Sequence, residues 1–430
     1  KIMLRVVEIK MSGSMPFARR IAGLLLLAMT ACTGGLNKKP TEATRSSITG
    51  TGPVEADGVE FSNITIQLID GDDVALVGVV PTFDATDTEN RNAYGGCSVS
   101  NSSGVSLCTL RSTKDETKVL RITSPLVLKG GSVRFVYGAA RKMNILTQPS
   151  TTAVAGVGLA QSPSLELLDN LGNRVLTATT AVTLSAYTDP NCTTPGSGTL
   201  TATTNPVTPT SGIVTFSNVA YTKNGNVYFK ASGASLTSSC TEAVNITHAV
   251  ANKIAFKTSP STTATAGANL ASQPEIEIQD TYGNRVSTGA AATSSVTLSA
   301  FTNATCTTAS ATSFSAQTNP LTATAGWATF SNVKTTLAQT TYIKAAVSGY
   351  AALCSAAITV SPNVPSTTTS TITGTGPVAA NGYHSSSVTI HLGDQYSNSI
   401  SGVTPTFSAT NTGSGNTYAC GATNTSGNAT

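Results

Sequence analysis

Charged side chains are scarce in this sequence of 430 residues. Asp, Glu, Lys and Arg make up 11% of it, against about 25% in a typical soluble domain. The net charge of +4 arises in residues 1–31, where five basic residues oppose one Glu, so the rest of the chain sums to zero. No basic patch is left to bind phosphates, and we expect no nucleic-acid partner.

Histidine and aromatic residues are also few. The only histidines are His248, His384 and His391, and none lies beside a Cys at the spacing of metal ligands. The sequence contains no G-x-S-x-G, G-x-G-x-x-G or P-loop motif. We therefore expect ordinary strand or linker positions for the three histidines, no catalytic site and no cofactor. Aromatic residues, at 5%, are too few for an obvious carbohydrate-binding face.

Hydroxyl and apolar side chains take the place of charge. The chain has 72 Thr and 49 Ser, and 40% of it is hydrophobic. In "EIEIQD", Ile276 and Ile278 face one way and the polar residues between them the other, and "VTLSAF" repeats this period at Val296, Leu298 and Ala300. Such short strands, separated by Gly, Pro, Asn and Asp turns, predict antiparallel β-sandwiches.

The chain repeats itself at domain length. "ITGTGPVEADGVEFSNITIQL" from Ile48 returns as "ITGTGPVAANGYHSSSVTIHL" from Ile372, which defines a module type A. Between these copies, "PSTTAVAGVGLAQSPSLELLDNLGNRV" from Pro149 matches "PSTTATAGANLASQPEIEIQDTYGNRV" from Pro260, which defines a type B. The order A-B-B-A predicts an array in which each module has its own core.

The modules resemble the bacterial immunoglobulin-like (Ig-like) domains of invasin- and intimin-type surface proteins. In module A the resemblance rests on "TGTGPVEADG", "SNITIQLID" and "SNSSGVSLCTLRSTKDETKVLRITSP", and in module B on the "D-x-x-G-N-x-V" stretches at Asp169 and Asp280. The resemblance implies a spacer and adhesion role and no reaction.

The first residues have the features of a secretory signal. Two arginines precede the apolar run Ile21–Ala31, which is too short to span a membrane as a helix. "LAMTAC" resembles the lipobox of bacterial lipoproteins, which implies that Cys32 is acylated; an ordinary cleaved signal is the alternative. Thr33 after that Cys implies the outer membrane by the same resemblance. Met15 is the expected start.

Cysteine spacing predicts three disulfides. Two pairs are separated by 48 residues at matching positions of the two B modules, and a shorter pair lies in the first A module. Cys420 matches Cys97, but its partner would fall one residue past the end of the sequence, so the last module is expected to continue. Disulfides indicate an oxidising, extracytoplasmic compartment. The expected pairs are Cys97–Cys108, Cys192–Cys240 and Cys306–Cys354.

Several smaller features have structural interpretations. Asp70, Asp72 and Asp73 are weak Ca²⁺ candidates, and a solvated turn is the simpler interpretation. The "D-x-x-G-N" stretches are interpreted as local turns. Trp327 aligns with Ile213 of the other B module, which favours a core or half-buried strand position over a sugar platform. The Ser/Thr-rich segments "NKKPTEATRSS" and "NVPSTTTS" are expected to be solvated linkers, and the second to bend freely.

The sequence thus predicts an all-β chain of tandem Ig-like antiparallel β-sandwiches in an A-B-B-A array behind a lipoprotein signal peptide. The expected segments are a signal peptide at 1–31, a lipidated Cys and linker at 32–47, module A at 48–138, modules B at 141–250 and 252–361, a linker at 362–371 and a truncated module A at 372–430.

The expected function is that of a cell-surface lipoprotein serving as a stalk or adhesin. It would be held at the membrane by its lipid and would contact an unknown surface protein or glycan. One alternative is the carrier part of an extracellular enzyme whose catalytic domain lies beyond residue 430. Another is a ligand- or sugar-binding protein that uses loops between strands, since such sites follow no fixed motif.

Overall fold

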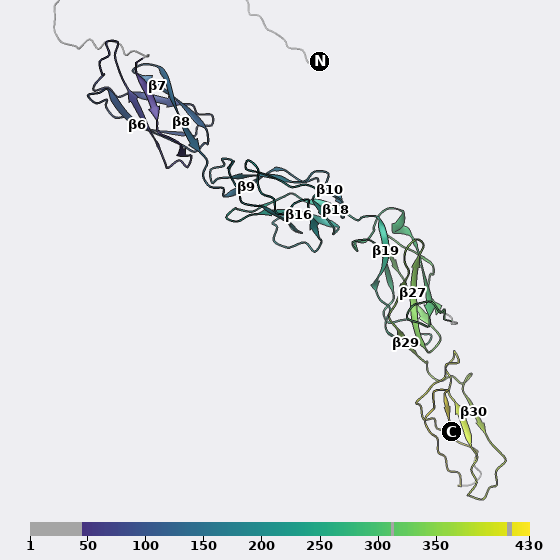
Figure 1. Ribbon diagram of the computed structural model, residues 1–430. Coiled ribbons are helices and arrows are strands. Elements are labelled where there is room, and N and C mark those ends of the chain that lie inside the picture. The colour runs from purple at the N-terminus through teal and green to yellow at the C-terminus, as the bar shows by residue number, and fades with distance from the viewer. Residues whose placement is uncertain (1–44, 311–313, 411–414) are drawn as a thin grey trace, which may run out of the picture. The chain divides into compact units, whose positions relative to one another are not determined.

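The computed structural model describes residues 45–310, 314–410 and 415–430 (Figure 1). The expected signal peptide at 1–31 and Cys32 lie outside these residues. Within them the regular structure is β, apart from a single 3-10 turn, η1 (Ala290–Thr293). The chain forms two compact units. Of the described residues, the first contains 45–52, Ser62–Leu110 and Thr117–Val133; the second contains Pro53–Phe61, Arg111–Glu116 and those from Arg134 to Thr430.

Eight strands between Ser47 and Val136 form two four-stranded sheets. The first has the order β1-β3-β6-β5 and the second β2-β8-β7-β4. With the short β2 left aside, β1 and β3–β8 taken in chain order correspond to strands A to G of an immunoglobulin constant domain, in which A, B, E and D form one sheet and C, F and G the other. The strands are β1 (Ser47–Gly50), β2 (Val54–Glu55), β3 (Ser62–Gln67), β4 (Thr82–Ala85), β5 (Asn92–Gly95), β6 (Val105–Ser112), β7 (Thr117–Ser124) and β8 (Leu128–Val136).

The next segment repeats this plan. Its sheets are β14-β11-β9 and β10-β18-β16-β12, with β17 paired to β16 and a separate β13-β15 pair. As in the first segment, where β2 runs parallel to β8, the short β10 runs parallel to the last strand, β18 (Figure 1). The strands are β9 (Lys142–Thr147), β10 (Thr152–Val154), β11 (Ser164–Leu168), β12 (Thr183–Tyr187), β13 (Leu200–Thr201), β14 (Ile213–Thr215), β15 (Ala220–Tyr221), β16 (Gly225–Ser232), β17 (Ser239–Cys240) and β18 (Val244–Thr247).

The third segment has the same topology. Its sheets are β19-β21-β25 and β20-β29-β27-β22-β24, with β28 paired to β27 and a separate β23-β26 pair. The strands are β19 (Ala251–Thr258), β20 (Thr263–Thr265), β21 (Glu275–Asp280), β22 (Ser295–Phe301), β23 (Phe314–Ser315), β24 (Leu321–Thr322), β25 (Trp327–Thr329), β26 (Lys334–Thr335), β27 (Thr340–Val347), β28 (Leu353–Cys354) and β29 (Ile358–Ser361).

The alternation seen in the sequence defines the core of this third segment. Ile276 and Ile278 on β21, and Val296, Leu298 and Ala300 on β22, are all buried. Except for Ala300 they belong to one cluster that includes residues of both sheets. Burial of an aliphatic side chain contributes about 1.5–3 kcal/mol. The period of two thus predicted the inward face correctly.

The last segment forms a three-stranded sheet, β30 (Thr371–Gly374), β31 (Val388–His391) and β32 (Asn428–Ala429). Its pairs match β1-β3-β6 of the first segment. In the first segment Ile48 on β1 is 1% exposed, whereas Ile372, at the same position of β30, is 57% exposed. The apolar pattern of β30 is therefore present without the burial that it has in β1.

The segment "NVPSTTTS", expected to be a freely bending linker, makes hydrogen bonds to the module that follows it. The Ser366 N–H donates to the Gly393 carbonyl (2.8 Å), and the Thr369 hydroxyl donates to the Asp394 carbonyl (2.7 Å). The Asn363 N–H donates to the Asp394 carboxylate (2.8 Å). Two of the hydroxyl side chains, those of Thr369 and Ser370, therefore attach this segment to the backbone of the following module, while Thr367 and Thr368 are exposed.

Candidate functional site: the disulfide loops

Three disulfides lie within the β-segments. Cys97–Cys108, Cys192–Cys240 and Cys306–Cys354 have Cα–Cα distances of 4.2, 6.2 and 5.8 Å. Each bridge has one Cys on a strand, at β6, β17 or β28, and the other in a loop. Cys420 is the free Cys of the described residues.

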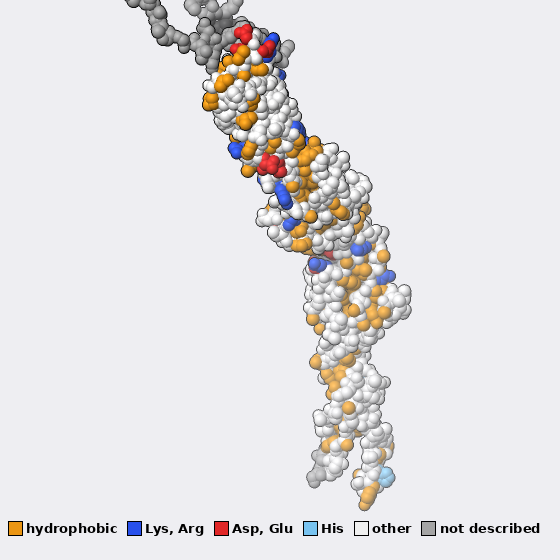
Figure 2. Space-filling view, turned by 60° about the vertical axis from the view of Figure 1, so that its left-hand side comes forward, with side chains coloured by type: hydrophobic (Ala, Val, Ile, Leu, Met, Phe, Trp, Pro, Cys, Tyr) orange, Lys and Arg blue, Asp and Glu red, His pale blue; other side chains and the backbone are white. Residues whose placement is uncertain are grey.

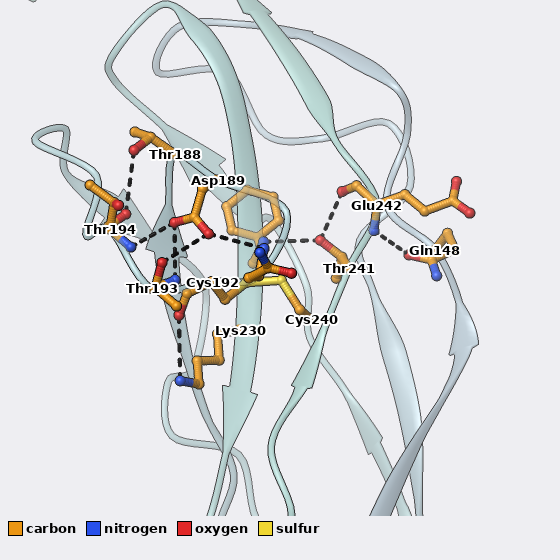
Figure 3. Close-up of a disulfide and its surroundings, with 12 residues drawn as sticks. Gln148, Thr188, Asp189, Cys192, Thr193, Thr194, Lys230, Cys240, Thr241 and Glu242 are labelled. Carbon is orange, nitrogen blue, oxygen red and sulfur yellow. Dashed lines mark hydrogen bonds between the residues drawn. A yellow bond between two sulfur atoms is a disulfide. The ribbon is translucent and has the colours of Figure 1, made fainter.

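The loop that contains Cys192 is built around the Asp189 carboxylate (Figure 3). This carboxylate accepts the N–H groups of Thr194 (2.6 Å) and Thr193 (3.0 Å), and also that of Asn191 (3.0 Å). The Thr194 N–H is the main cause that lowers the pKa of Asp189 to about 2, against the smaller opposing effect of burial. The ionised carboxylate thus holds the loop that turns Cys192, at φ 52°, toward Cys240.

The other B-type segment makes the same loop with a neutral side chain. Asn303 stands where Asp189 does, and its Oδ1 accepts the N–H groups of Thr307 and Thr308, both at 3.0 Å. Cys306 has a φ of 51°, almost the same as Cys192. The geometry therefore needs a side-chain acceptor at this position, while the charge is optional.

A hydroxyl group next to the strand cysteine fixes the opposite side of each bridge. The Thr241 hydroxyl accepts the Phe229 N–H (2.9 Å) and donates to the Glu242 carbonyl (2.9 Å), as Figure 3 shows. Ser355 makes the equivalent two bonds, with the Ile343 N–H and the Ala356 carbonyl. The Cys192–Cys240 and Cys306–Cys354 bridges are thus each held from both ends by local hydrogen bonds, as expected for a structural disulfide.

The acidic stretch at Asp70 forms a turn. Asp70 Oδ1 accepts the N–H groups of Asp72 (2.9 Å) and Val74 (3.0 Å), and Asp73 pairs with Arg45. Across the residues that the structure describes, no group of three or more His, Cys, Asp or Glu is arranged to hold a metal ion.

The three histidines form hydrogen bonds with uncharged groups. His248 contacts the Ala249 carbonyl and the Thr288 hydroxyl, both at 2.9 Å. His384 contacts the Asn381 amide, and His391 the Asn428 amide at 3.1 Å. These partners are a carbonyl, a hydroxyl and amides, whereas a catalytic triad needs a carboxylate and a nucleophile.

Trp327 is more exposed than the alignment with Ile213 suggested. It lies on β25, as a strand position, but 39% of it is exposed. Its indole N–H donates to Glu277 (3.1 Å), and the Arg285 guanidinium lies 4.0 Å from the ring centroid. One face of the ring is therefore occupied by Arg285.

Sequence reasoning missed one buried cation. Lys118 on β7 is fully buried, and its ammonium lies 3.8 Å from the Asp87 carboxylate. Burial favours a higher pKa for Asp87, but N–H groups of Arg91 and Asn92 and the charge of Lys118 together lower it. The alternating pattern of β7 places Lys118 inward, and this is the signal that could have identified it.

The surface is poor in charge. Most of the face in Figure 2 consists of uncharged polar groups and backbone, with scattered hydrophobic side chains and few charged ones. This matches the 11% of charged residues in the sequence. Long-range electrostatic attraction of a partner is therefore not a property of this face.

No protein-family model and no curated protein matches the sequence. Among solved structures, the Escherichia coli adhesin FdeC is similar over 75% of this chain and 99% of its own, at 13% identity and a TM-score of 0.36. InvD of Yersinia pseudotuberculosis is similar over 75% and 100%, at 15% identity and 0.36. The integrin-binding protein invasin is similar over 79% and 62%, at 15% identity and 0.32. The strand order within its segments shows that the chain has an Ig-like β-sandwich fold, and the structures similar to it include bacterial adhesins.

Proposed function

We propose that the chain is the stalk of a bacterial cell-surface protein that acts in adhesion or envelope architecture. The observation that carries this proposal is the repetition of Ig-like segments with separate cores, three of which contain their own disulfide. Disulfides persist in extracytoplasmic compartments, and a repeated sandwich supplies length without requiring a reaction.

A module deletion on intact cells tests this role. Removal of residues 252–361 should shorten the reach of the protein and weaken binding of cells to a host-cell or extracellular-matrix layer. An antibody to residues 141–250 should still label unpermeabilised cells, which controls for export. Unchanged binding after deletion of the whole protein would contradict the adhesive role, and labelling only after permeabilisation would contradict the surface location.

We also propose that the protein is anchored by lipid at Cys32. The support is the lipobox-like "LAMTAC" sequence, which lies outside the described residues. Among the residues that are described, no helix has the length and apolar character needed to cross a membrane. Two or more acyl chains suffice for stable attachment to a bilayer. Outer-membrane placement follows the same lipoprotein resemblance through Thr33.

Labelling with a radioactive fatty acid tests the anchor. Cys32→Ala should abolish the label, whereas Cys420→Ala, which removes the other Cys not in a disulfide, should retain it. A label that survives Cys32→Ala would refute lipidation at this residue.

A further inference from the structure

One five-residue turn occurs in all four repeated segments. It begins at Asp70, Asp169, Asp280 and Asp394, and in each copy Oδ1 of the Asp accepts the N–H groups of the third and fifth residues at 2.8–3.0 Å. The fourth residue has a positive φ in every copy, at Asp73, Gly172, Gly283 and Ser397. The backbone of the turn is therefore the same in all four.

The fifth residue differs between copies. It is Asn173, Asn284 and Asn398 in the three later segments, but Val74 in the first. The three asparagines are no more than 6% exposed, whereas Val74 is 57% exposed. Because the turn at Asp70 keeps both of its Oδ1 bonds with Val at this position, the Asn side chain is not needed to form the turn.

The Asn side chains bond to the segment that precedes their own. Nδ2 of Asn284 donates to the Thr222 carbonyl (2.7 Å), and Oδ1 accepts the Asn224 N–H (3.0 Å). The same pair of bonds joins Asn173 to the Thr113 carbonyl and the Asp115 N–H, and joins Asn398 to the Thr336 carbonyl and the Ala338 N–H. Each contacted loop lies just before the equivalent strand, β7, β16 or β27.

The Asp of the turn completes the contact. Oδ2 of Asp280 accepts Nδ2 of Asn284 (2.9 Å) and the N–H of Ala249 in the connecting segment (2.9 Å). Asp169 and Asp394 accept the N–H groups of Gly138 and Asn363 in the same way. For Asp280, burial would raise the pKa, but the bonds from Ala249 and Asn284 outweigh it and lower the pKa. Asp280 and Asn284 thus form hydrogen bonds within the turn, to the connecting segment and to the loop of the preceding segment.

An aromatic residue in the last two turns adds to the contact. Tyr282, the third residue of its turn, lies over Gly156, and Tyr396 lies over Gly267, where a Cβ atom would overlap the ring. In each case the Gly belongs to the preceding segment. The corresponding residue of the first turn is Asp72. In the second turn it is Leu171, so the aromatic contact occurs only at the last two joints, while the Asn contact occurs at all three.

We propose that the Asp-x-x-x-Asn turn is a docking site for the loop before strand β7, β16 or β27 of the preceding module, and that Asn at its fifth position marks a module that follows another. All three pairs of contacts lie within the second compact unit. The proposal concerns how modules are joined and does not depend on the adhesive role of the chain.

Hydrogen exchange of the full chain, resolved to single residues, tests this with Asn284→Val. Val74 shows that the turn accepts Val. The Asn224 N–H should exchange roughly tenfold faster because it loses its acceptor. The Tyr282 N–H, held by Asp280, should exchange at an unchanged rate. Val74→Asn is the matched control, and it should change neither rate.

Every other outcome contradicts the proposal. Faster exchange at both Asn224 and Tyr282 would show that Asn284 stabilises its own turn and has no separate role in the contact with the preceding module. Unchanged exchange at Asn224 would show that the bond across the joint does not form. If Asn284→Val does not fold, Asn284→Ala is measured in the same way, and failure of both to fold would show that the Asn is required within its own module.

Discussion

Removal of the Cys306–Cys354 disulfide should destabilise its own segment by a predictable amount. The bridge closes a loop with a sequence separation of 48. The chain-entropy model gives about 4 kcal/mol at 25 °C for a loop of this length, a large part of the ~5–15 kcal/mol that stabilises a typical domain. The variant Cys306→Ala/Cys354→Ala avoids placing a hydroxyl at the buried Cys306 position.

The single Trp of the chain makes this loss measurable. Trp327 lies in the same segment, between Arg285 and Glu277, so its fluorescence should change when that segment unfolds. With a urea m-value of ~1–3 kcal/mol per M, a loss of about 4 kcal/mol lowers the midpoint by roughly 1.3–4 M. The m-value itself should stay nearly constant.

A matched variant in the neighbouring segment separates local from general effects. Cys192→Ala/Cys240→Ala removes a bridge with the same sequence separation of 48, but Trp327 lies outside that segment. Its fluorescence midpoint should therefore change little. An unchanged midpoint in the first variant, or equal shifts in both, would refute the reasoning that each bridge stabilises its own core.

Three further predictions concern other parts of the chain. The pKa of Asp189 falls from 3.8 to about 2 in the folded state, so its contribution to stability is complete above pH 3.8 and is lost as the pH falls through 2. The NMR chemical shift of the Thr194 amide should change over the same pH range. The shift of the Thr308 amide, which is bonded to the neutral Asn303, should not change. The Cys97–Cys108 bridge closes a loop with a sequence separation of only 11, so Cys97→Ala/Cys108→Ala should lower the free energy of unfolding by about 2.8 kcal/mol, less than the loss of either longer bridge. Chemical denaturation followed by hydrogen exchange at β6 measures this loss. The purified protein should show no hydrolase turnover on polymer substrates, and activity that disappears on His248→Ala would contradict this.

The sequence allowed the fold to be predicted because its main signal is local. Ile276 and Ile278 alternate with polar residues, and such a period specifies a strand with one buried face whatever the partner strands are. The matching offsets of the repeats likewise identified which segments share a fold. The exposure of Trp327 was not predicted, because its alignment with the half-buried Ile213 indicates a shared strand position and not how far a larger ring extends from it.

The role proposed for the turns could not be read from their local pattern. Asp169 and Asn173 were interpreted as turn residues, and they do form a turn. The partner of Asn173 is the Thr113 carbonyl, 60 residues earlier, and no periodicity connects the two positions. The signal that was available is the contrast between Val74 and Asn398, which occupy the same position of two otherwise similar A modules.

The two halves of the proposed joint lie on different parts of a module, which makes the contact heterologous. Each B module has both halves of the joint, a turn that binds the preceding module and a loop that is bound by the next one. In the first B module, Asn173 bonds to the segment before it, while Thr222 and Asn224 are bonded by Asn284 of the segment after it. A head-to-tail contact of this kind leaves one half unused at each end of an array, so it can be repeated from module to module. A tandem duplication of one B module in the gene would therefore supply both halves of the new joint at once, and such an array could lengthen without any compensating mutation.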